Sequence, residues 1–395
     1  MSSLLEQASL VVTPNGTKAS KLYSVKPTDG SGDMTVVRET TATRVNSSGL
    51  IKSSAVNVPR LDYTGSTCPS ILVEPQRTNL LLRSEEFDNA IWNTSEVTIT
   101  PNVSISPNGS LTAVRVLISG GGFIFQDSTC LPNTVYTFSF YARLGTIPFN
   151  KFLFALRDNT NGVFIAQDLV PNVTLVTTEW RRVTYTFTTP VGCLSLRPYV
   201  YRNTSSYNVG DTFFVWGAQL EAGANATSYI PTTTASVTRN ADVISKTGIS
   251  DLIGQTEGTI FAEVNFTASN LSDRTIVNLS DNTTANWIFI RTSATVPNGI
   301  RFRIANGGAL QFDYNSSAIS AGVHKLCLSY KLNNISAYID GVKVSSSTTA
   351  TIPATSKINI GCMHDNLLQF NDRIKSALLF KTQLTDQECI NLTTI

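Results

Sequence analysis

The chain has 395 residues, a length that predicts two or three domains and excludes a single small module. Charged residues make up only 15% of the chain, against about 25% in an average soluble protein. The 30 basic and 28 acidic residues leave a formal charge of +2, so an electrostatic nucleic-acid binder is not expected. The sequence has no run of about 18 apolar residues, and membrane insertion is not expected either.

Residues 1 to about 80 mix short apolar runs with turn clusters, such as TPNGTK from Thr13 and PTDGSGD from Pro27. Such clusters without sustained periodicity predict extended, irregular structure with short strands. We expect a separate N-terminal segment, whose removal up to about residue 75 leaves the rest of the chain folded.

Residues 81–242 contain strand-like runs at the spacing of a β-sandwich, followed by a Gly-, Ala- and Thr-rich linker from Gly223. Tyr136, Phe138 and Phe140 alternate with small or polar residues, which places the three rings on one face of a sheet. This pattern predicts a first antiparallel sandwich.

Residues 243–395 contain a second set of strand-like runs, including TIFAEVNF from Thr259 and HKLCLSY from His324. Asp340 and Gly341 lie between two apolar runs and predict a two-residue hairpin turn. TDQE from Thr385 has the pattern of a capping box and predicts a short helix over about 386–392. The fold class is therefore all-β, with an irregular N-terminal segment, two antiparallel β-sandwich (jelly-roll) domains and a short C-terminal helix.

The sequence offers little material for catalysis. It has two histidines, and its nearest acidic pairs, Glu85 with Glu86 and Asp386 with Glu388, open a domain and cap a helix. Neither pair has the pattern of a glycosidase dyad, so a non-enzymatic protein is expected, although carboxylates remote in sequence can still meet in space. The six cysteines lack C-x-x-C spacing and are interpreted as reduced, buried thiols.

Aromatic residues provide the candidate ligand site. Sugars stack their C–H faces on flat exposed rings, with amides and carboxylates binding the hydroxyls. An aromatic residue that alternates with polar residues on a sandwich strand is more often part of the core, and Trp180 and Trp216 are interpreted in that way. The candidates for exposed, glycan-binding rings are Trp92, Tyr201, Tyr207 and Trp287.

Three carboxylates at the two ends of the middle region, Glu86, Asp88 and Glu221, are candidate ligands for a structural calcium ion. Sandwiches of this type often tie their termini together with hard oxygen ligands. The spacing itself specifies no site, and no other cofactor is expected.

Several stretches resemble a group of tailed-bacteriophage virion structural proteins of the head or tail fibre or spike type. They are SLVVTPNG from Ser9, YSVKPTDGSGDM from Tyr23, TATRVNSSGLI from Thr41, PRLDY from Pro59, LVEPQRTNLLLRSEEFDNAIW from Leu72 and FVWGAQLEAGANATSYIPT from Phe214. In those proteins the middle segment looks like a carbohydrate-binding-module jelly roll. The resemblance also implies a homotrimer.

The C-terminal region resembles concanavalin A-like, laminin-G-like sandwiches. The resemblance is carried by GTIFAEV from Gly258, HKLCLSYKLNNISAYIDGVKV from His324 and RIKSALLFKTQLTDQECINL from Arg373. The chain lacks the E-x-D-x-E strand of glycosidases with this fold, so the resemblance does not imply hydrolysis.

The expected function is that of a non-enzymatic structural protein on the surface of the phage virion, in which two lectin-like sandwiches attach to host or environmental glycans. The expected partners are other virion proteins, docked through residues 1–80, and host-surface glycans. Two alternatives stay open: a purely architectural capsid decoration or cement protein without a ligand, and a glycan-depolymerising enzyme.

Overall fold

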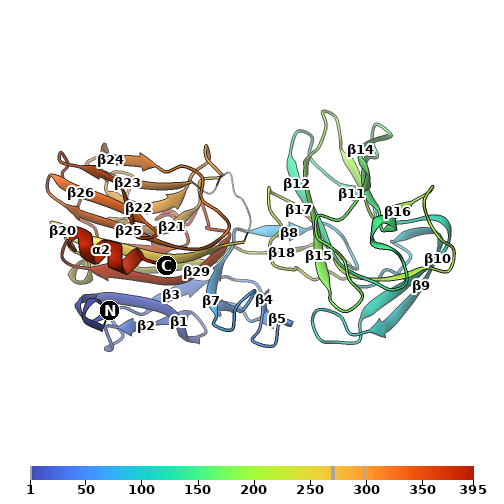
Figure 1. The fold of residues 1–395 in the computed structure, drawn as a ribbon, viewed down its shortest axis with the longest axis horizontal. Helices are drawn as coiled ribbons and strands as arrows, with labels where there is room; N and C mark the ends of the chain where they lie inside the picture. The colour runs from blue at the N-terminus through green and yellow to red at the C-terminus, as the bar shows by residue number, and fades with distance from the viewer. Residues whose placement is uncertain (1, 268–271, 298) are drawn as a thin grey trace. The chain divides into compact units, whose positions relative to one another are not determined.

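The computed structural model describes residues 2–267, 272–297 and 299–395, and it divides into two compact units (Figure 1). The first unit comprises residues 1–49, 53–76 and 240–395, and the second comprises residues 50–52 and 77–239. The chain therefore begins in the first unit, completes the second, and returns to the first near residue 240. The sequence prediction had placed these transitions close by, at about 80 and 242.

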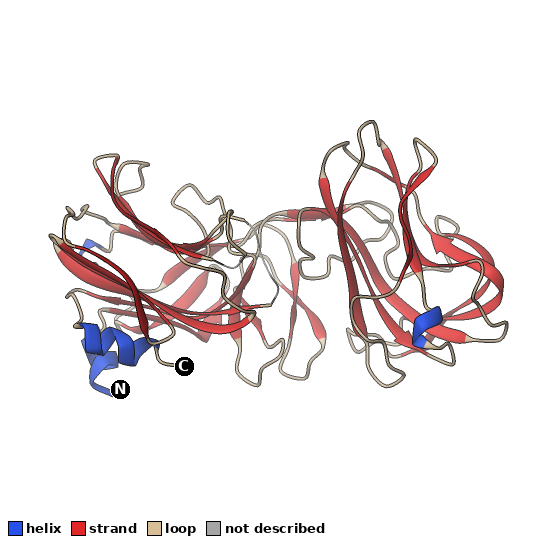
Figure 2. Ribbon diagram, turned by 45° about the horizontal axis from the view of Figure 1, so that its top comes forward, coloured by secondary structure: helices blue, strands red, loops and turns tan. Residues whose placement is uncertain are grey.

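The first unit consists almost entirely of strands, with short helices near both ends of the chain (Figure 2). Its elements are α1 (Ser2–Gln7), β1 (Leu10–Lys18), β2 (Lys21–Lys26), β3 (Met34–Val37), β4 (Ala42–Val45), β6 (Arg60–Asp62), β7 (Ser70–Val73), β19 (Val243–Thr247), η2 (Ser250–Leu252), β20 (Glu257–Phe266), β21 (Thr275–Ser280), β22 (Trp287–Thr292), β23 (Ile300–Asn306), β24 (Ala309–Asn315), β25 (Gly322–Lys331), β26 (Asn334–Ile339), β27 (Val342–Ser347), β28 (Lys357–Ile360), β29 (Asp372–Phe380) and α2 (Asp386–Thr393). The short strand β5 (Ile51–Ser54) pairs with β4 and has residues assigned to both units.

The main sheet of the first unit runs in the order β24-β23-β22-β21-β28-β19-β3-β2-β1-β29-β20-β25-β26-β27, and β7 and then β6 branch off at β29. Its hydrophobic core joins residues from both ends of this order, such as Ile288 and Phe302 with Ile260 and Leu328. The sheet therefore folds onto itself as two packed layers, as expected for a sandwich.

The N-terminal residues form part of this sandwich and not a segment of their own. Strand β1 pairs antiparallel with β29, with Leu10 opposite Leu379, and β3 pairs with β19. Leu10, Val12 and Leu22 are buried in the shared core. The region that the sequence predicted as irregular thus completes a sheet by pairing with distant strands, with Leu10 opposite Leu379 and Val36 opposite Ile244.

A group of buried charges lies in the first unit, where the chain returns from the second. Asp242 is 2% exposed, and its carboxylate accepts hydrogen bonds from Arg38 Nη1 at 2.9 Å, from Arg60 and from the backbone N–H of Glu74 at 3.0 Å. Arg60 also donates to the Glu74 carboxylate at 2.6 Å. Two guanidinium groups and two carboxylates therefore neutralise each other inside the protein, as burial of charge requires.

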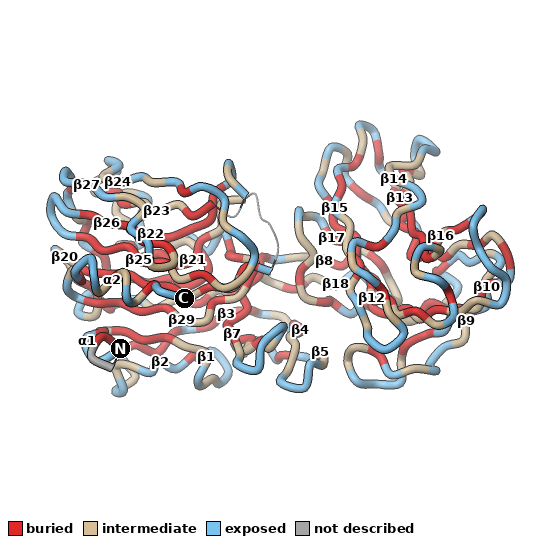
Figure 3. The backbone as a smooth tube through the Cα atoms, in the orientation of Figure 1, coloured by how far each residue is buried: buried red, intermediate tan, exposed pale blue. Residues whose placement is uncertain are grey.

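The second unit is an antiparallel sandwich of its own. Its elements are β8 (Arg77–Asn79), β9 (Asn93–Ser104), β10 (Ala113–Phe125), β11 (Ser128–Thr129), β12 (Val135–Leu144), η1 (Phe149–Lys151), β13 (Phe154–Asp158), β14 (Val163–Leu169), β15 (Arg181–Thr188), β16 (Ser195–Asn203), β17 (Thr212–Ala222) and β18 (Val237–Arg239). Nine of these strands form one sheet through β14-β13-β16-β10-β17-β12-β15, with β9 and β11 on its flanks. Figure 3 shows that buried positions concentrate in the strands and exposed positions in the loops.

The all-β class and the short C-terminal helix are confirmed. Helix α2 begins after Thr385, whose side chain accepts from the Glu388 N–H while Glu388 accepts from the Thr385 N–H, which is the predicted capping box. Asp340 and Gly341 form the predicted two-residue turn between β26 and β27, with φ of 49° and 80°. Both values lie in the left-handed region that such a hairpin needs.

Replacing Asp242 by Asn should strongly destabilise the protein. The substitution leaves two buried guanidinium groups with one carboxylate, and breaking a buried ion pair of this kind typically costs about 3 to 5 kcal/mol. Urea unfolding measures this loss. The matched control is Asp251→Asn, because Asp251 is an exposed aspartate of the same unit. Equal unfolding midpoints for both variants would contradict the structural role of the buried charges.

Deletion of residues 1–76 should prevent the first unit from folding, because it removes β1, β2 and β3 from the middle of the main sheet and Leu10, Val12 and Leu22 from the core. This reverses the expectation from the sequence that the remainder folds alone. Circular dichroism and thermal melting of the deletion variant test it, with residues 1–76 added back as a separate peptide to restore the fold. A cooperative melt of residues 240–395 without that peptide would refute it.

Candidate aromatic and arginine-lined binding face

One face of the sheet portion β28-β21-β22-β23-β24 carries polar and aromatic side chains in place of a second core. Along β22, Ile288 and Ile290 point into the hydrophobic core, so Trp287, Phe289 and Arg291 lie on the opposite face. The register brings Phe289 opposite Arg303 of β23 and opposite Asn278 of β21. We call the face formed by Trp287, Phe289, Arg291, Arg301, Arg303, Asp313, Asn278 and Asn359 the β22 face.

Two stacked rings and two guanidinium groups form its centre. The ring centroids of Trp287 and Phe289 are 4.6 Å apart with an interplanar angle of 19°. Arg303 lies 5.4 Å from the Trp287 centroid, and Arg291 lies 4.6 Å from that of Phe289. Phe289 is buried beneath these groups, whereas Trp287 is half-buried and its indole N–H donates to the Thr284 carbonyl at 3.0 Å. The β22 face thus presents a fixed, partly accessible indole, with the guanidinium groups of Arg303 and Arg291 beside the stacked rings.

Arginines outnumber the carboxylates that pair with them. Asp313 accepts from Arg301 Nε and Nη2 at 2.8 and 2.6 Å and lies 3.3 Å from Arg303, while Arg291 lies 3.3 Å from Asp273. Three guanidinium groups therefore share two carboxylates. This excess of positive charge in a partly desolvated site favours a ligand that carries a carboxylate.

The pKa directions agree with this geometry. The hydrogen bonds from Arg301 lower the pKa of the Asp313 carboxyl group, so this carboxylate stays ionised at neutral pH. Burial lowers the pKa of Arg291 and of Arg303, although both guanidinium groups start from a value so high that they remain charged. The β22 face therefore keeps its net positive charge.

A pair of buried amides lies next to the rings. Asn278 and Asn359 are opposite each other on β21 and β28, and both are 0% exposed. Their Nδ2 groups donate to the Leu279 carbonyl at 3.2 Å and to Cys362 Sγ at 3.4 Å, but neither Oδ1 atom has a hydrogen-bond partner among the described residues. Unpartnered buried oxygens of this kind are commonly satisfied by an ordered water molecule.

The structure separates the four predicted glycan-binding rings. Trp287 is on the β22 face, and Tyr207, 36% exposed, lies in the second unit between β16 and β17. The prediction that Trp92 and Tyr201 are exposed is wrong. Trp92 is 4% exposed because it packs against Phe87 at 4.6 Å, and its N–H donates to the Arg83 carbonyl. Tyr201 is 0% exposed, with Phe213 at 4.8 Å.

The sequence prediction missed Phe289, Arg291 and Arg303. The signal was present in WIFIR from Trp287 and RFRI from Arg301, since each run alternates core residues with aromatic or basic ones. Only the pairing of the two strands shows that both outward sets occupy one face.

The three carboxylates proposed as calcium ligands are not brought together. Among the residues that the structure describes, no three His, Cys, Asp or Glu side chains form a group able to hold a metal ion. Glu86 pairs with Arg83, and Asp88 is exposed. Glu221 is 0% exposed, and its carboxylate accepts hydrogen bonds from the Gln219 side chain and from the N–H and hydroxyl of Thr227. Its oxygens therefore stabilise the fold.

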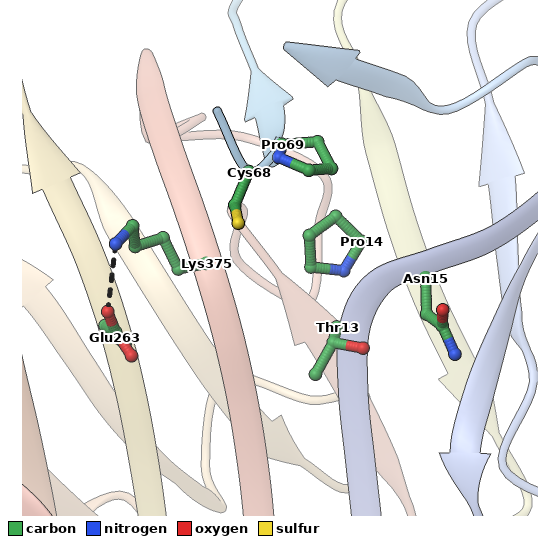
Figure 4. Close-up of a pocket in the computed structure, with 7 residues that line it drawn as sticks. All are labelled: Thr13, Pro14, Asn15, Cys68, Pro69, Glu263 and Lys375. Carbon is green, nitrogen blue, oxygen red and sulfur yellow. Dashed lines mark hydrogen bonds and ion pairs between the residues drawn. The ribbon is translucent and has the colours of Figure 1, made fainter. Parts of the chain in front are cut away.

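The first unit also contains a pocket of about 330 Å³ on the outer side of β20 and β29 (Figure 4). Its lining residues are Thr13, Pro14, Asn15, Cys68, Pro69, Glu263 and Lys375. The pocket arises where β29 changes partners: β7 pairs with it up to Ile374, and β1 pairs with it from Ala377. Lys375 Nζ is 3.2 Å from Glu263 Oε1, so the two charges at the floor neutralise each other.

Comparison with known proteins identifies part of the chain. Residues 231–389 match the family model described as the concanavalin A-like lectin/glucanases superfamily, laminin-G type. These residues form a concanavalin A-like domain. The β22 face belongs to this domain, and the first 76 residues add strands to it. No curated protein sequence matches the chain.

Among solved structures, the chain is similar to the CBM40 of a Ruminococcus gnavus IT-sialidase bound to α2,3-sialyllactose, with 14% identity, a TM-score of 0.32, and coverage of 36% of this chain and 84% of that one. It is also similar to domain 4 of AbnA, a GH43 extracellular arabinanase from Geobacillus stearothermophilus in complex with arabinotriose, with 14% identity, a TM-score of 0.32, and coverage of 43% and 82%. At this level of similarity the ligands of those proteins do not identify a ligand for this one. No helix among the described residues is long and apolar enough to cross a bilayer.

A thiol reagent should modify Cys68 alone in the folded protein. Cys68 is exposed in the pocket, whereas Cys130, Cys193, Cys327, Cys362 and Cys389 are buried. Maleimide labelling followed by mass spectrometry should give one adduct per native chain and six after denaturation. The Cys68→Ser variant should remain unlabelled when native, and labelling of any other cysteine would contradict the burial described here.

Proposed function

We propose that the protein is a non-enzymatic attachment protein on a phage virion and that its concanavalin A-like domain binds glycans through the β22 face. The observation that carries the binding role is the stack of Trp287 on Phe289 beside Arg303, where Trp287 and Arg303 are both partly exposed. A ring for the sugar face and a cation for an acidic substituent are groups that recognition of an acidic glycan needs. The arginine excess favours acidic over neutral glycans.

The virion role, with residues 1–80 docking to other virion proteins and with a homotrimeric assembly, rests on the sequence resemblance alone. The burial of the N-terminal strands in the first sandwich alters how such docking would work. A virion partner would bind the outer surface of these strands, because their inner side chains already belong to the core.

The charges on the β22 face argue for binding and against hydrolysis. A glycosidase needs one carboxyl group that is protonated near neutral pH and a second carboxylate nearby. Asp313 is the opposite case, because Arg301 lowers its pKa.

Asp62 and Asp372 both pair with Arg373, and they resemble a catalytic pair of carboxyl groups more closely than Asp313 does. Burial raises the pKa of Asp372 to about 6, and the pKa of Asp62 is lowered because Arg373 and hydrogen bonds outweigh its burial. Both are enclosed. Asp372 is 7% exposed and accepts the backbone N–H of Thr267, and Asp62 is 2% exposed and accepts the backbone N–H of Val45. This arrangement stabilises the fold and leaves a sugar no access.

Trp287→Ala should reduce glycan binding at least tenfold, because a stacking ring at the centre of a binding face commonly contributes more than about 1.4 kcal/mol. The first probes are 3′-sialyllactose as an acidic glycan and lactose as its neutral counterpart, followed by a glycan array. Wild type should prefer the acidic probe, and Arg303→Ala should remove that preference while retaining part of the neutral binding. Added salt should weaken the acidic preference as well.

The matched control is Tyr207→Ala, which removes an exposed ring of the second unit and should leave binding unchanged. Absence of any array signal would favour the purely architectural role, and shortening of a bound glycan would show an enzyme. Either result would overturn the proposal. Fractionation of purified particles tests the virion role independently of the glycan result.

A further inference from the structure

We propose that Cys130 and Cys193 of the second unit are a site of disulfide formation, which would convert a pair of buried thiols into a covalent staple within the sandwich. Their Sγ atoms lie 3.5 Å apart, and Cys130 Sγ is 3.4 Å from the Cys193 carbonyl oxygen. Forming a bond of about 2.0 Å requires this Sγ–Sγ distance to shorten by about 1.5 Å. The site is independent of the β22 face, which belongs to the other unit.

The backbone already holds the two cysteines in place. Strand β11 pairs antiparallel with the start of β16, with Thr129 opposite Ser195. Cys130 follows β11 directly, and its N–H donates to the Leu194 carbonyl at 3.0 Å, which extends the pairing by one step. Cys193 is one residue before Leu194, so its side chain contacts Cys130 from the adjacent segment of the same chain. Residues 63 positions apart in sequence are thereby side by side.

The reaction balances with a small-molecule disulfide such as oxidised glutathione as oxidant. One cysteine, as its thiolate, attacks a glutathione sulfur, forms a mixed disulfide and releases one glutathione thiolate. The second cysteine, deprotonated, attacks the protein sulfur of that mixed disulfide and releases the second glutathione thiolate. Two protein thiols lose two protons and two electrons, and one oxidised glutathione becomes two reduced molecules.

The environment of the pair determines when this reaction can occur. Cys130 and Cys193 are 8% and 0% exposed, which keeps oxidant out of the folded unit. Burial also raises the pKa of both thiols, that of Cys193 to about 12, so little thiolate is present at neutral pH. The bond should therefore form while the chain folds in an oxidising buffer, and only slowly in the native protein.

Refolding tests the site. Denatured, reduced protein carrying Cys68→Ser, which removes the exposed thiol, is refolded with a glutathione redox buffer and then digested without reduction. Mass spectrometry should find the peptides of Cys130 and Cys193 joined. Native protein kept in the same buffer should acquire the bridge far more slowly. The oxidised protein should melt higher by on the order of 10 °C, because the bridge restricts the unfolded chain.

The single variants Cys130→Ser and Cys193→Ser supply the controls. Each should show the same melting temperature with and without the oxidising step, so the comparison holds even if serine itself destabilises the unit. Two results would overturn the proposal: a refolded chain that keeps all its thiols, or a bridge that maps to another pair such as Cys327 and Cys389.

Discussion

The first sandwich depends on one buried carboxylate. Asp242 is the point at which the chain returns from the second unit, and it binds Arg38 and Arg60 from the N-terminal residues together with the backbone of Glu74. Without these partners its burial would carry a large desolvation penalty, and the two arginines would face the same penalty without it. The charges are therefore stable only when N-terminal and C-terminal strands are assembled together, which links completion of the sheet to the correct pairing of distant segments.

This linkage explains which parts of the fold could be predicted from the sequence. The Asp340-Gly341 turn and the Thr385 capping box are local: their donors and acceptors lie within four residues, so a short motif specifies them. The N-terminal strands are not local. Leu10 finds its partner at Leu379, and no property of residues 1–80 alone indicates that the missing strands lie at the other end of the chain.

The candidate site shows the same limit. Trp92 and Trp287 both stand beside turn residues in the sequence and looked equally exposed, yet Phe87 covers the first while the second stacks on the outer side of a sheet. Exposure depends on which neighbours arrive from elsewhere in the fold. The alternation around Trp287 indicated two faces, but only the pairing of β22 with β23 shows that the arginines share the face with the rings.

The low charge content of the chain gives the β22 face its significance. In a protein with few charges, three arginines gather with Asp313 on one sheet face, and Asp273 in the loop before β21 pairs with Arg291, so the group keeps a net positive charge. Asp313 and the two rings also hold the guanidinium groups in place before any ligand binds. A ligand that binds such a preorganised face does not have to immobilise flexible arginine side chains, and this retains binding energy that a mobile surface would lose. Arg301 in turn lowers the pKa of the Asp313 carboxyl group, so the carboxylate that fixes the arginines stays ionised at neutral pH.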